Sequence, residues 1–428
     1  MGAENLTVAK YWRLVRDNRN YRRLWLAQII SETGDWFYML ALYSLLLQFT
    51  GKAQSVGFAL VLQVLPSTLV GPMAGVVNDR IRRRQVMIAA DLARMMIVAA
   101  MTLVRSAQMI WLVYPLLFLE TVMWGFFEPA RSAVIPNVVG EDQLLAANTV
   151  SSITWSVTFA VGSAIGGFVA VWLGRDAVFV LNALSFLVSA LLISRMQFHE
   201  PHADSPIPFH ARELVNFSPV LEGIRYIRRD FRLLATVLLK AGIGVLGANW
   251  VIFPIMGERV FPVRIGGLDA ARGAILGMSV LMGARGVGAL TGPLAAAKWA
   301  GNREPRMRAG ILAAFVAGAL GYMLLAGAPE PALACAAVAL AHAGGSVVWV
   351  FSTTLLQRYS DDRFRRRVFA ADLGIFMLVM AVAGALAGIL IDSGIGVRTV
   401  AFSTGVAMLV PALAWFWALR RWREAGVN

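Results

Sequence analysis

The chain has 428 residues, of which 58% are hydrophobic and only 15% are charged, and its mean hydropathy is +0.66. This composition excludes a pair of soluble domains and indicates a protein that crosses the membrane many times. The net charge of +14 is carried largely by arginines in short clusters between apolar runs rather than on one face of a soluble fold, so no nucleic-acid partner is expected.

The first 22 residues are basic and amphipathic. Val8, Tyr11, Trp12 and Val15 recur at helical spacing among basic residues, which predicts a cytoplasmic helix lying on the membrane surface. A partly ordered tail is the alternative. The apolar run that follows is longer than a signal-peptide core, so we expect no cleaved signal.

Twelve apolar runs then follow, each about long enough to cross the hydrocarbon as a helix. A proline-containing linker at 197–232 separates six-helix bundles at 23–196 and 233–419, and a cytoplasmic tail occupies 420–428. The predicted spans are 23–49, 54–77, 86–105, 109–128, 147–173, 177–196, 233–257, 272–297, 309–328, 332–356, 369–391 and 398–419.

The basic residues predict the orientation of these spans. Of the 39 lysines and arginines, 29 fall in segments on the side of the N-terminus and 7 in segments on the opposite side. Because basic loops stay in the cytoplasm, both termini are predicted to be cytoplasmic, in a bacterial inner membrane.

The two halves of the chain also repeat each other. Gly71 and Pro72 recur as Gly292 and Pro293 at an offset of 221, and the glycine pair Gly162 and Gly166 recurs as Gly384 and Gly388 at an offset of 222. Near-constant offsets at two places indicate a duplicated six-helix unit, an arrangement common among secondary transporters. Close helix packing is the other explanation of the glycine pairs.

The loop after the second span carries the most specific motif. Residues 71–84 read GPMAGVVNDRIRRR, in which Asp79 follows Gly75 by four positions and precedes a cluster of arginines. This pattern resembles the signature loop of the major facilitator superfamily. Residues 21–42, 126–148 and 222–229 look like the branch of that superfamily that holds the enterobactin exporter and the macrolide efflux pumps.

The resemblance implies an all-α membrane fold of twelve helices in two pseudo-symmetric halves, and transport rather than enzymatic activity. It also implies a gating latch: Asp79 would sit against the cytoplasmic start of the eleventh span and, with Arg83 and Glu128, hold the halves together when the outside is open. Gly75 belongs to the same motif. A basic loop that only sets the topology is the alternative. The second-half copy has Trp299 and Ala300 where an aspartate would stand, so the latch is expected in the first copy alone.

Charged side chains within the spans mark candidate functional sites, because burying a charge in a membrane costs free energy. Glu32 and Asp35 lie on one face of the first span and Glu120 lies in the fourth; we predict these acids to be the proton-coupling candidates. The predicted counter-charges and cavity residues are Arg285, His342 and Lys240. Permanent pairing of Glu32 or Asp35 with Arg285 or Lys240 is the alternative. Asp91 and Arg94 are predicted to pair with each other.

Four tryptophans at depth on these helices are predicted to line the substrate cavity, although helix packing explains them equally well: Trp36, Trp155, Trp250 and Trp349. The predicted function is proton-coupled antiport that exports a small amphipathic drug, antibiotic or siderophore, carried out by a monomer in the lipid bilayer. A lysophospholipid or lipid flippase and a non-transporting receptor or scaffold are the alternatives.

No cofactor is expected beyond the proton gradient. The chain has no phosphate-binding glycine loop that would couple transport to ATP. The linker histidines His199, His202 and His210 lack the ligand spacing of a metal site, so no metal is expected.

Overall fold

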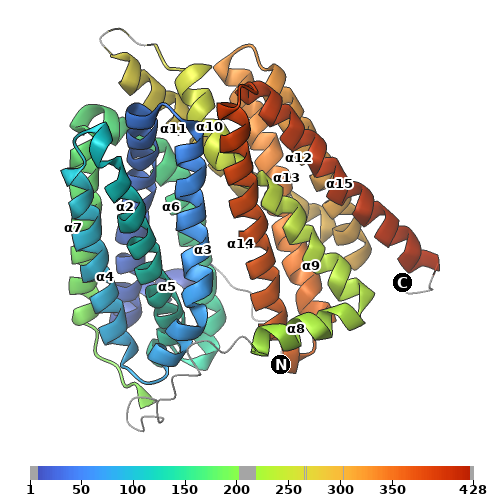
Figure 1. Cartoon of the computed structure of the whole chain (residues 1–428). Coiled ribbons are helices and arrows are strands. Elements are labelled where there is room, and N and C mark those ends of the chain that lie inside the picture. Colours follow the sequence, from blue (N-terminus) through green and yellow to red (C-terminus); the bar gives the residue numbers. More distant parts are fainter. Residues whose placement is uncertain (1–7, 202–217, 265, 267, 302, 425–428) are drawn as a thin grey trace. The chain divides into compact units, whose positions relative to one another are not determined.

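The computed structural model describes residues 8–201, 218–264, 266, 268–301 and 303–424, and the regular secondary structure of this part of the chain consists of helices, with no β-strand (Figure 1). The predicted all-α membrane fold is confirmed. The α-helices are α1 (Val8–Asp17), α2 (Arg19–Thr50), α3 (Ala53–Asn78), α4 (Arg83–Ala100), α5 (Val113–Val138), α6 (Leu144–Leu173), α7 (Arg175–Ser194), α8 (Ser218–Arg229), α9 (Phe231–Gly244), α10 (Asn249–Arg259), α11 (Ala270–Ala300), α12 (Glu304–Gly327), α13 (Pro331–Tyr359), α14 (Asp362–Asp392) and α15 (Val397–Glu424).

Within the described residues, eleven helical segments are long and apolar enough to cross a membrane. The remaining predicted span is α2, which has 32 residues and is therefore long enough, but carries Glu32 and Asp35 among its apolar side chains. All twelve predicted spans thus correspond to helical segments of the structure.

One predicted boundary was wrong. The fourth span does not end at 128, because α5 continues through Pro129 and Pro136 to Val138. Arg131, which lies beyond the predicted end of this span, is therefore inside the helix. The predicted start of the eleventh span at 369 agrees within two residues with the apolar span that begins at Arg367, although α14 itself begins earlier, at Asp362. Single prolines are tolerated in membrane helices when neighbouring groups satisfy the freed backbone carbonyls, which is why a proline was a poor stop signal here.

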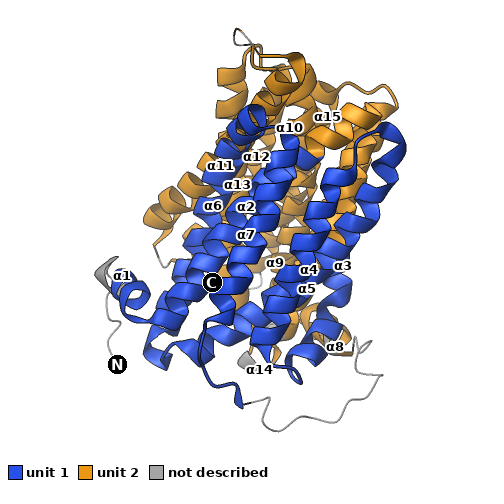
Figure 2. Cartoon of the chain, turned by 90° about the vertical axis from the view of Figure 1, so that its left-hand side faces the viewer, with its two compact units in different colours: residues 1–42, 66–216 blue, residues 43–65, 217–428 orange. Residues whose placement is uncertain are grey.

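The chain forms two compact units, coloured separately in Figure 2: unit 1 is Met1–Leu42 with Pro66–Asn216, and unit 2 is Tyr43–Leu65 with Phe217–Asn428. The ends of α2 and α3 that meet at the turn between them thus belong to unit 2. The domain boundaries drawn from the sequence stay a prediction.

In unit 1, α1 packs against the ends of the longer helices. Leu14 and Val15 are buried in a cluster with Tyr21 and Leu24 of α2, whereas Trp12 is 62% exposed. Asn18, in the short link between α1 and α2, donates from Nδ2 to the carbonyl of Val138 at 2.6 Å. These contacts confirm the helix and attach it to the end of α5; its place on the membrane surface stays a prediction.

In unit 2, the seventh span is not one continuous helix. The 3-10 turn Val245–Ala248 separates α9 from α10. A Cβ atom on Gly247 would lie 2.3 Å from the carbonyl oxygen of Met380 in α14, so only glycine allows this close approach. The break in the helix therefore lies where Gly247 comes into close contact with Met380 of α14.

The repeated glycine pairs also mark close helix contacts. A Cβ atom on Gly162 would lie 2.9 Å from Cβ of Trp36 in α2, and one on Gly388 would lie 2.8 Å from Cα of Gln54 in α3. Packing is therefore a sufficient reason for glycine at these positions. At Gly71 and Gly75, by contrast, an added Cβ would meet no described atom of unit 1 within 4 Å, so close packing in that unit does not require glycine there.

Candidate functional site

Unit 1 contains a buried ion pair between Asp91 and Arg94, both in α4, as the sequence predicted. Ser189 of α7 donates to the second oxygen of Asp91 at 2.6 Å. The guanidinium carbon of Arg94 lies 4.6 Å from the ring centroid of Phe127 and 4.2 Å from that of Phe186. Two aromatic faces and a carboxylate thus hold the arginine between α4, α5 and α7.

Two further acids join this pair. Asp35 of α2 and Glu120 of α5 are both attracted by Arg94, and their carboxylates repel each other. Asn182 of α7 donates from Nδ2 to Asp35 at 3.3 Å. We call Asp35, Asp91, Arg94 and Glu120 the acidic cluster. It places three carboxylates around one guanidinium, so its acids outnumber its bases.

The sequence allows this cluster to form through a glycine beside Asp35. A Cβ atom on Gly34 would lie 2.3 Å from Oδ1 of Asn182 and 2.5 Å from Oγ of Ser185. Glycine at this position therefore lets α7 approach α2 closely enough for its amide to reach the carboxylate of Asp35.

Glu32 does not join the acidic cluster, although it lies only three residues before Asp35. Its carboxylate accepts hydrogen bonds from Nε2 of Gln28 and from Oγ1 of Thr158, both at 2.9 Å. Gln28 in turn accepts from Arg131 at 3.1 Å, and Arg131 donates two hydrogen bonds to Glu128, of 2.6 and 2.9 Å. The two acids of α2 thus belong to different networks, one toward α7 and one toward α6 and α5.

The predicted latch residues are placed only in part. Glu128 pairs with Arg131, whereas Arg83 donates to the carbonyl of Ala133 at 2.9 Å and to Asn137 at 3.3 Å. The described contacts therefore do not join Arg83 to Glu128. Asp79 is exposed in the turn after α3, and its backbone N–H donates to the carbonyl of Gly75 at 3.0 Å. The latch stays a prediction.

An acid that the sequence reasoning missed lies beside this loop. Glu200 is 7% exposed, and its carboxylate accepts the backbone N–H of Arg83 at 2.7 Å. A carboxylate at a helix N-terminus satisfies backbone donors that have no partner within the helix. The start of the predicted linker is thereby attached to the start of α4.

Unit 2 contains its own buried ion pair, between Lys240 of α9 and Asp372 of α14. The ammonium nitrogen also lies 4.4 Å from the ring centroid of Trp349 in α13. Lys240 thus has an acid partner in its own unit, which is neither Glu32 nor Asp35. The sequence reasoning missed Asp372, although this residue lies three positions inside the predicted span 369–391.

The other predicted counter-charge and cavity residues of unit 2, Arg285 and His342, lie among aromatic side chains. The guanidinium carbon of Arg285 is 4.2 Å from the ring centroid of Trp250. His342 is 6% exposed, its Nε2 lies 3.3 Å from the hydroxyl of Tyr322, and its ring meets Phe253 edge-on at 5.6 Å. A cation–π contact thus holds Arg285, and a phenol and an aromatic ring lie against the imidazole of His342.

The predicted cavity tryptophans of unit 1 contact each other. Trp36 and Trp155 meet edge-on with centroids 6.0 Å apart, and Phe159 lies 4.6 Å from Trp36. Trp155 is 51% exposed. Thr158, which donates to Glu32, lies between Trp155 and Phe159 in the sequence, so this aromatic group adjoins the Glu32 network.

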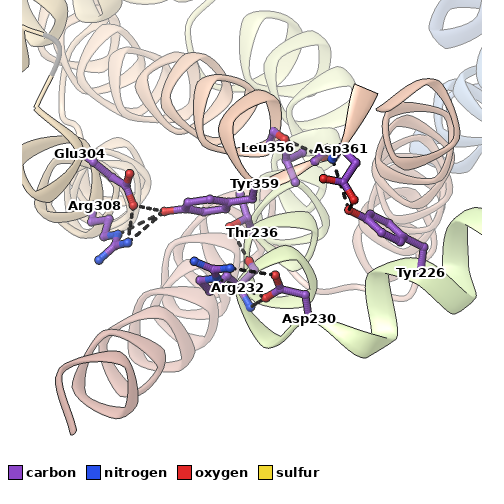
Figure 3. Close-up of polar contacts among 10 residues, drawn as sticks. Tyr226, Asp230, Arg232, Thr236, Glu304, Arg308, Leu356, Tyr359 and Asp361 are labelled. Carbon is purple, nitrogen blue, oxygen red and sulfur yellow. Dashed lines mark hydrogen bonds and ion pairs between the residues drawn. The ribbon is translucent and has the colours of Figure 1, made fainter. Parts of the chain in front are cut away.

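A further polar network ties helix ends of unit 2 together, as Figure 3 shows. Tyr359, the last residue of α13, donates to Glu304 at the start of α12, and Arg308 pairs with the same carboxylate. Tyr226 of α8 donates to Asp361 at 3.1 Å and accepts its backbone N–H at 3.2 Å. Helix α8, in the predicted linker, is therefore attached to the start of α14.

Comparisons with known proteins agree with this architecture. The family model described as Major Facilitator Superfamily matches residues 24–371. Macrolide efflux protein A of Streptococcus pyogenes is 25% identical over 376 residues, which cover 86% of this chain and 88% of that protein. The uncharacterized MFS-type transporter YfiS of Bacillus subtilis is 28% identical over 233 residues, about half the length of each chain.

Two solved structures show the same fold. A bacterial homologue of the human lysosomal transporter Spinster has a TM-score of 0.70 at 14% identity, covering 96% of this chain and 98% of its own. The nucleoside transporter NupG has a TM-score of 0.70 at 11% identity, covering 93% of this chain and 98% of its own. At these identities the likeness concerns the fold alone.

Proposed function

Since the chain belongs to the major facilitator superfamily of membrane transporters, we propose that it exports small amphipathic organic compounds in exchange for protons by alternating access. The observation that carries the proposal is the acidic cluster. Three carboxylates around one guanidinium cannot all be neutralised by that arginine, and an ionised carboxylate without a counter-charge is costly in a membrane.

Asp91 has the direct ion pair with Arg94, so Asp35 and Glu120 are the acids whose charge is least compensated. Such groups can bind a proton while water reaches them from one side of the membrane. They can release it while water reaches them from the other side. Exchange of protons for substrate then follows if a cationic or amphipathic molecule occupies the site when the acids are ionised.

The substrate class rests on separate support. The aromatic group of Trp36, Trp155 and Phe159 offers flat apolar surface beside the carboxylate of Glu32. A relative that matches along most of its length is named as a macrolide efflux protein. Aromatic faces next to a carboxylate suit an organic molecule with an apolar body and a positive charge.

The test is transport into proteoliposomes driven by an imposed pH gradient, with a macrolide and a fluorescent cationic dye as probes. We expect Asp35→Asn and Glu120→Gln each to reduce gradient-driven transport at least about tenfold while leaving gradient-independent exchange of the probe measurable. The matched control is Asp176→Asn, which removes an acid of unit 1 that is 41% exposed and paired with Arg105.

Transport by Asp35→Asn and Glu120→Gln with full dependence on the pH gradient would exclude proton coupling through this cluster. Movement of labelled lipid between leaflets, without movement of either probe, would replace export with the flippase function.

A further inference from the structure

The turn between α2 and α3 is held by two side chains of opposite charge. Asp392, the last residue of α14, accepts the backbone N–H groups of Ala53 at 2.9 Å and Gln54 at 2.8 Å. Arg259, the last residue of α10, donates from Nη2 to the carbonyl of Gly51 at 2.9 Å. All of these residues belong to unit 2, and the charge distribution of the sequence assigns this turn to the outer side.

Each side chain is at the helix end that suits its charge. The first backbone N–H groups of α3 have no partner within the helix and carry partial positive charge, which a carboxylate neutralises. The carbonyl of Gly51 follows the last residue of α2, where the helix dipole favours a cation. Gly51 itself has φ of +63°, a conformation that glycine adopts without strain.

The helix faces beneath this turn are in close contact. A Cβ atom on Gly57 would lie 2.8 Å from the carbonyl oxygen of Gly384, and one on Gly384 would lie 2.3 Å from Leu60. The first turns of α3 therefore lie directly against α14, and Ser55 and Ala59 are 6% and 0% exposed. Separation of α3 from α14 would break both hydrogen bonds of Asp392 and bring water to these buried positions.

We propose that Arg259 and Asp392 form an outer latch, which holds the α2–α3 turn while the predicted outer side is closed and releases it when that side opens. The latch rests on the proposed function in one respect, namely that alternating access requires this side to open once in each cycle. Asp392 is exposed, so water competes for its hydrogen bonds and the latch is weak enough to break. A capping carboxylate of this kind shifts an equilibrium by about fivefold, which biases the closed state without fixing it.

The test measures the labelling of buried cysteines by a water-soluble maleimide in lipid nanodiscs, where both faces of the protein meet the reagent. The single native cysteine, Cys335, is first replaced by alanine. Ser55→Cys and Ala59→Cys then introduce small changes at positions one turn apart on α3. We expect Asp392→Ala and Arg259→Ala each to raise the labelling rate at both positions, by about fivefold for the aspartate. Asp392→Asn, which keeps one acceptor oxygen, should have an intermediate effect.

The matched control is Asp269→Ala. Asp269 also caps a helix on the predicted outer side, accepting the backbone N–H of Arg272 at 2.8 Å. It caps its own helix α11 and, among the described residues, accepts no hydrogen bond from a second helix. Its removal should leave both labelling rates within twofold of the parent.

Two results would overturn the latch. One is unchanged labelling at both positions in Asp392→Ala and Arg259→Ala protein that is folded and monodisperse. The other is faster labelling at Ser55→Cys alone, which would mean that only the first turn of α3 frays. Because labelling requires no substrate and no gradient, a failure of proton-coupled transport would leave this measurement interpretable.

Discussion

Units 1 and 2 bury their charges differently, although the sequence repeats at a spacing of about 222 residues. In unit 1, three carboxylates share one arginine within the acidic cluster. In unit 2, Lys240 and Asp372 form a pair, and Arg285 lies against an aromatic ring. Glu120 of the cluster is 222 positions before His342, so the repeat places an acid in one half and an imidazole in the other.

This difference indicates that the two halves of a duplicated fold have different roles. The glycine pairs of α6 and α14 make close helix contacts in both halves, whereas the buried charges differ between the halves. Because excess carboxylates occur in unit 1, we expect proton exchange to depend on its residues, and we expect the pair in unit 2 to act mainly on stability. Three sets of substitutions test this comparison.

The largest effect is expected for Arg94→Met. This change leaves Asp91 buried without its cation and removes the attraction that Arg94 exerts on Asp35 and Glu120. Removal of one partner from a buried pair typically costs about 3–5 kcal/mol. We therefore expect a large fall in the thermal unfolding midpoint of the purified protein in detergent.

The double substitution Asp91→Leu with Arg94→Met distinguishes a shared arginine from a simple pair. A simple pair replaced by apolar side chains would recover the stability of the parent. Because Arg94 also serves two other acids, the double variant should remain destabilised. Full recovery would show that the acidic cluster is only an ion pair. Arg105→Met, at a side chain that is 61% exposed, is the control and should change the midpoint little.

A smaller effect is expected in unit 2. Lys240→Met leaves Asp372 buried, with a cost of roughly 3 kcal/mol, but the double variant Lys240→Met with Asp372→Leu should return close to the parent, because the pair has no third charged member among the described residues. The same unfolding measurement applies. A double variant as unstable as the single one would mean that unit 2 also shares its charges, and the comparison between the units would not hold.

The sequence was sufficient for the helical membrane fold because hydropathy depends on composition within a window. All twelve spans have a helical segment, including α2 with its two acids. Composition failed where local signals conflict: α5 continues past two prolines to Val138, beyond the predicted end of the fourth span at 128.

The candidate site was less predictable, because which helices meet depends on their rotation and packing rather than on spacing. Asp35, Glu120 and Arg94 could be recognised as charged residues within spans, but nothing in the sequence joins Asp35 to Asn182, 147 positions away. Helical spacing placed Glu32 and Asp35 on one face, and the structure directs them to separate networks. Successive residues of an α-helix are rotated by about 100°, so side chains three positions apart point in different enough directions for each to contact a different neighbouring helix.

The smallest effect concerns a pair of contacts related by the repeat. Arg83 and Asn137 in unit 1 are matched, at offsets of 221 and 222, by Glu304 and Tyr359 in unit 2. Tyr359→Phe removes a hydroxyl that donates to Glu304 and accepts from Arg308 at 3.1 Å. We therefore expect the free energy of unfolding to fall by about 1 kcal/mol. Asn137→Ala should lower the free energy of unfolding by less, at most about 0.5 kcal/mol, because Arg83 keeps its hydrogen bond to the carbonyl of Ala133 at 2.9 Å. The thermal unfolding midpoints of the two variants, measured under the same conditions, show which variant loses more stability. Equal losses, or a larger loss for Asn137→Ala, would mean that the two halves depend equally on this contact despite the exchange of an arginine for a glutamate.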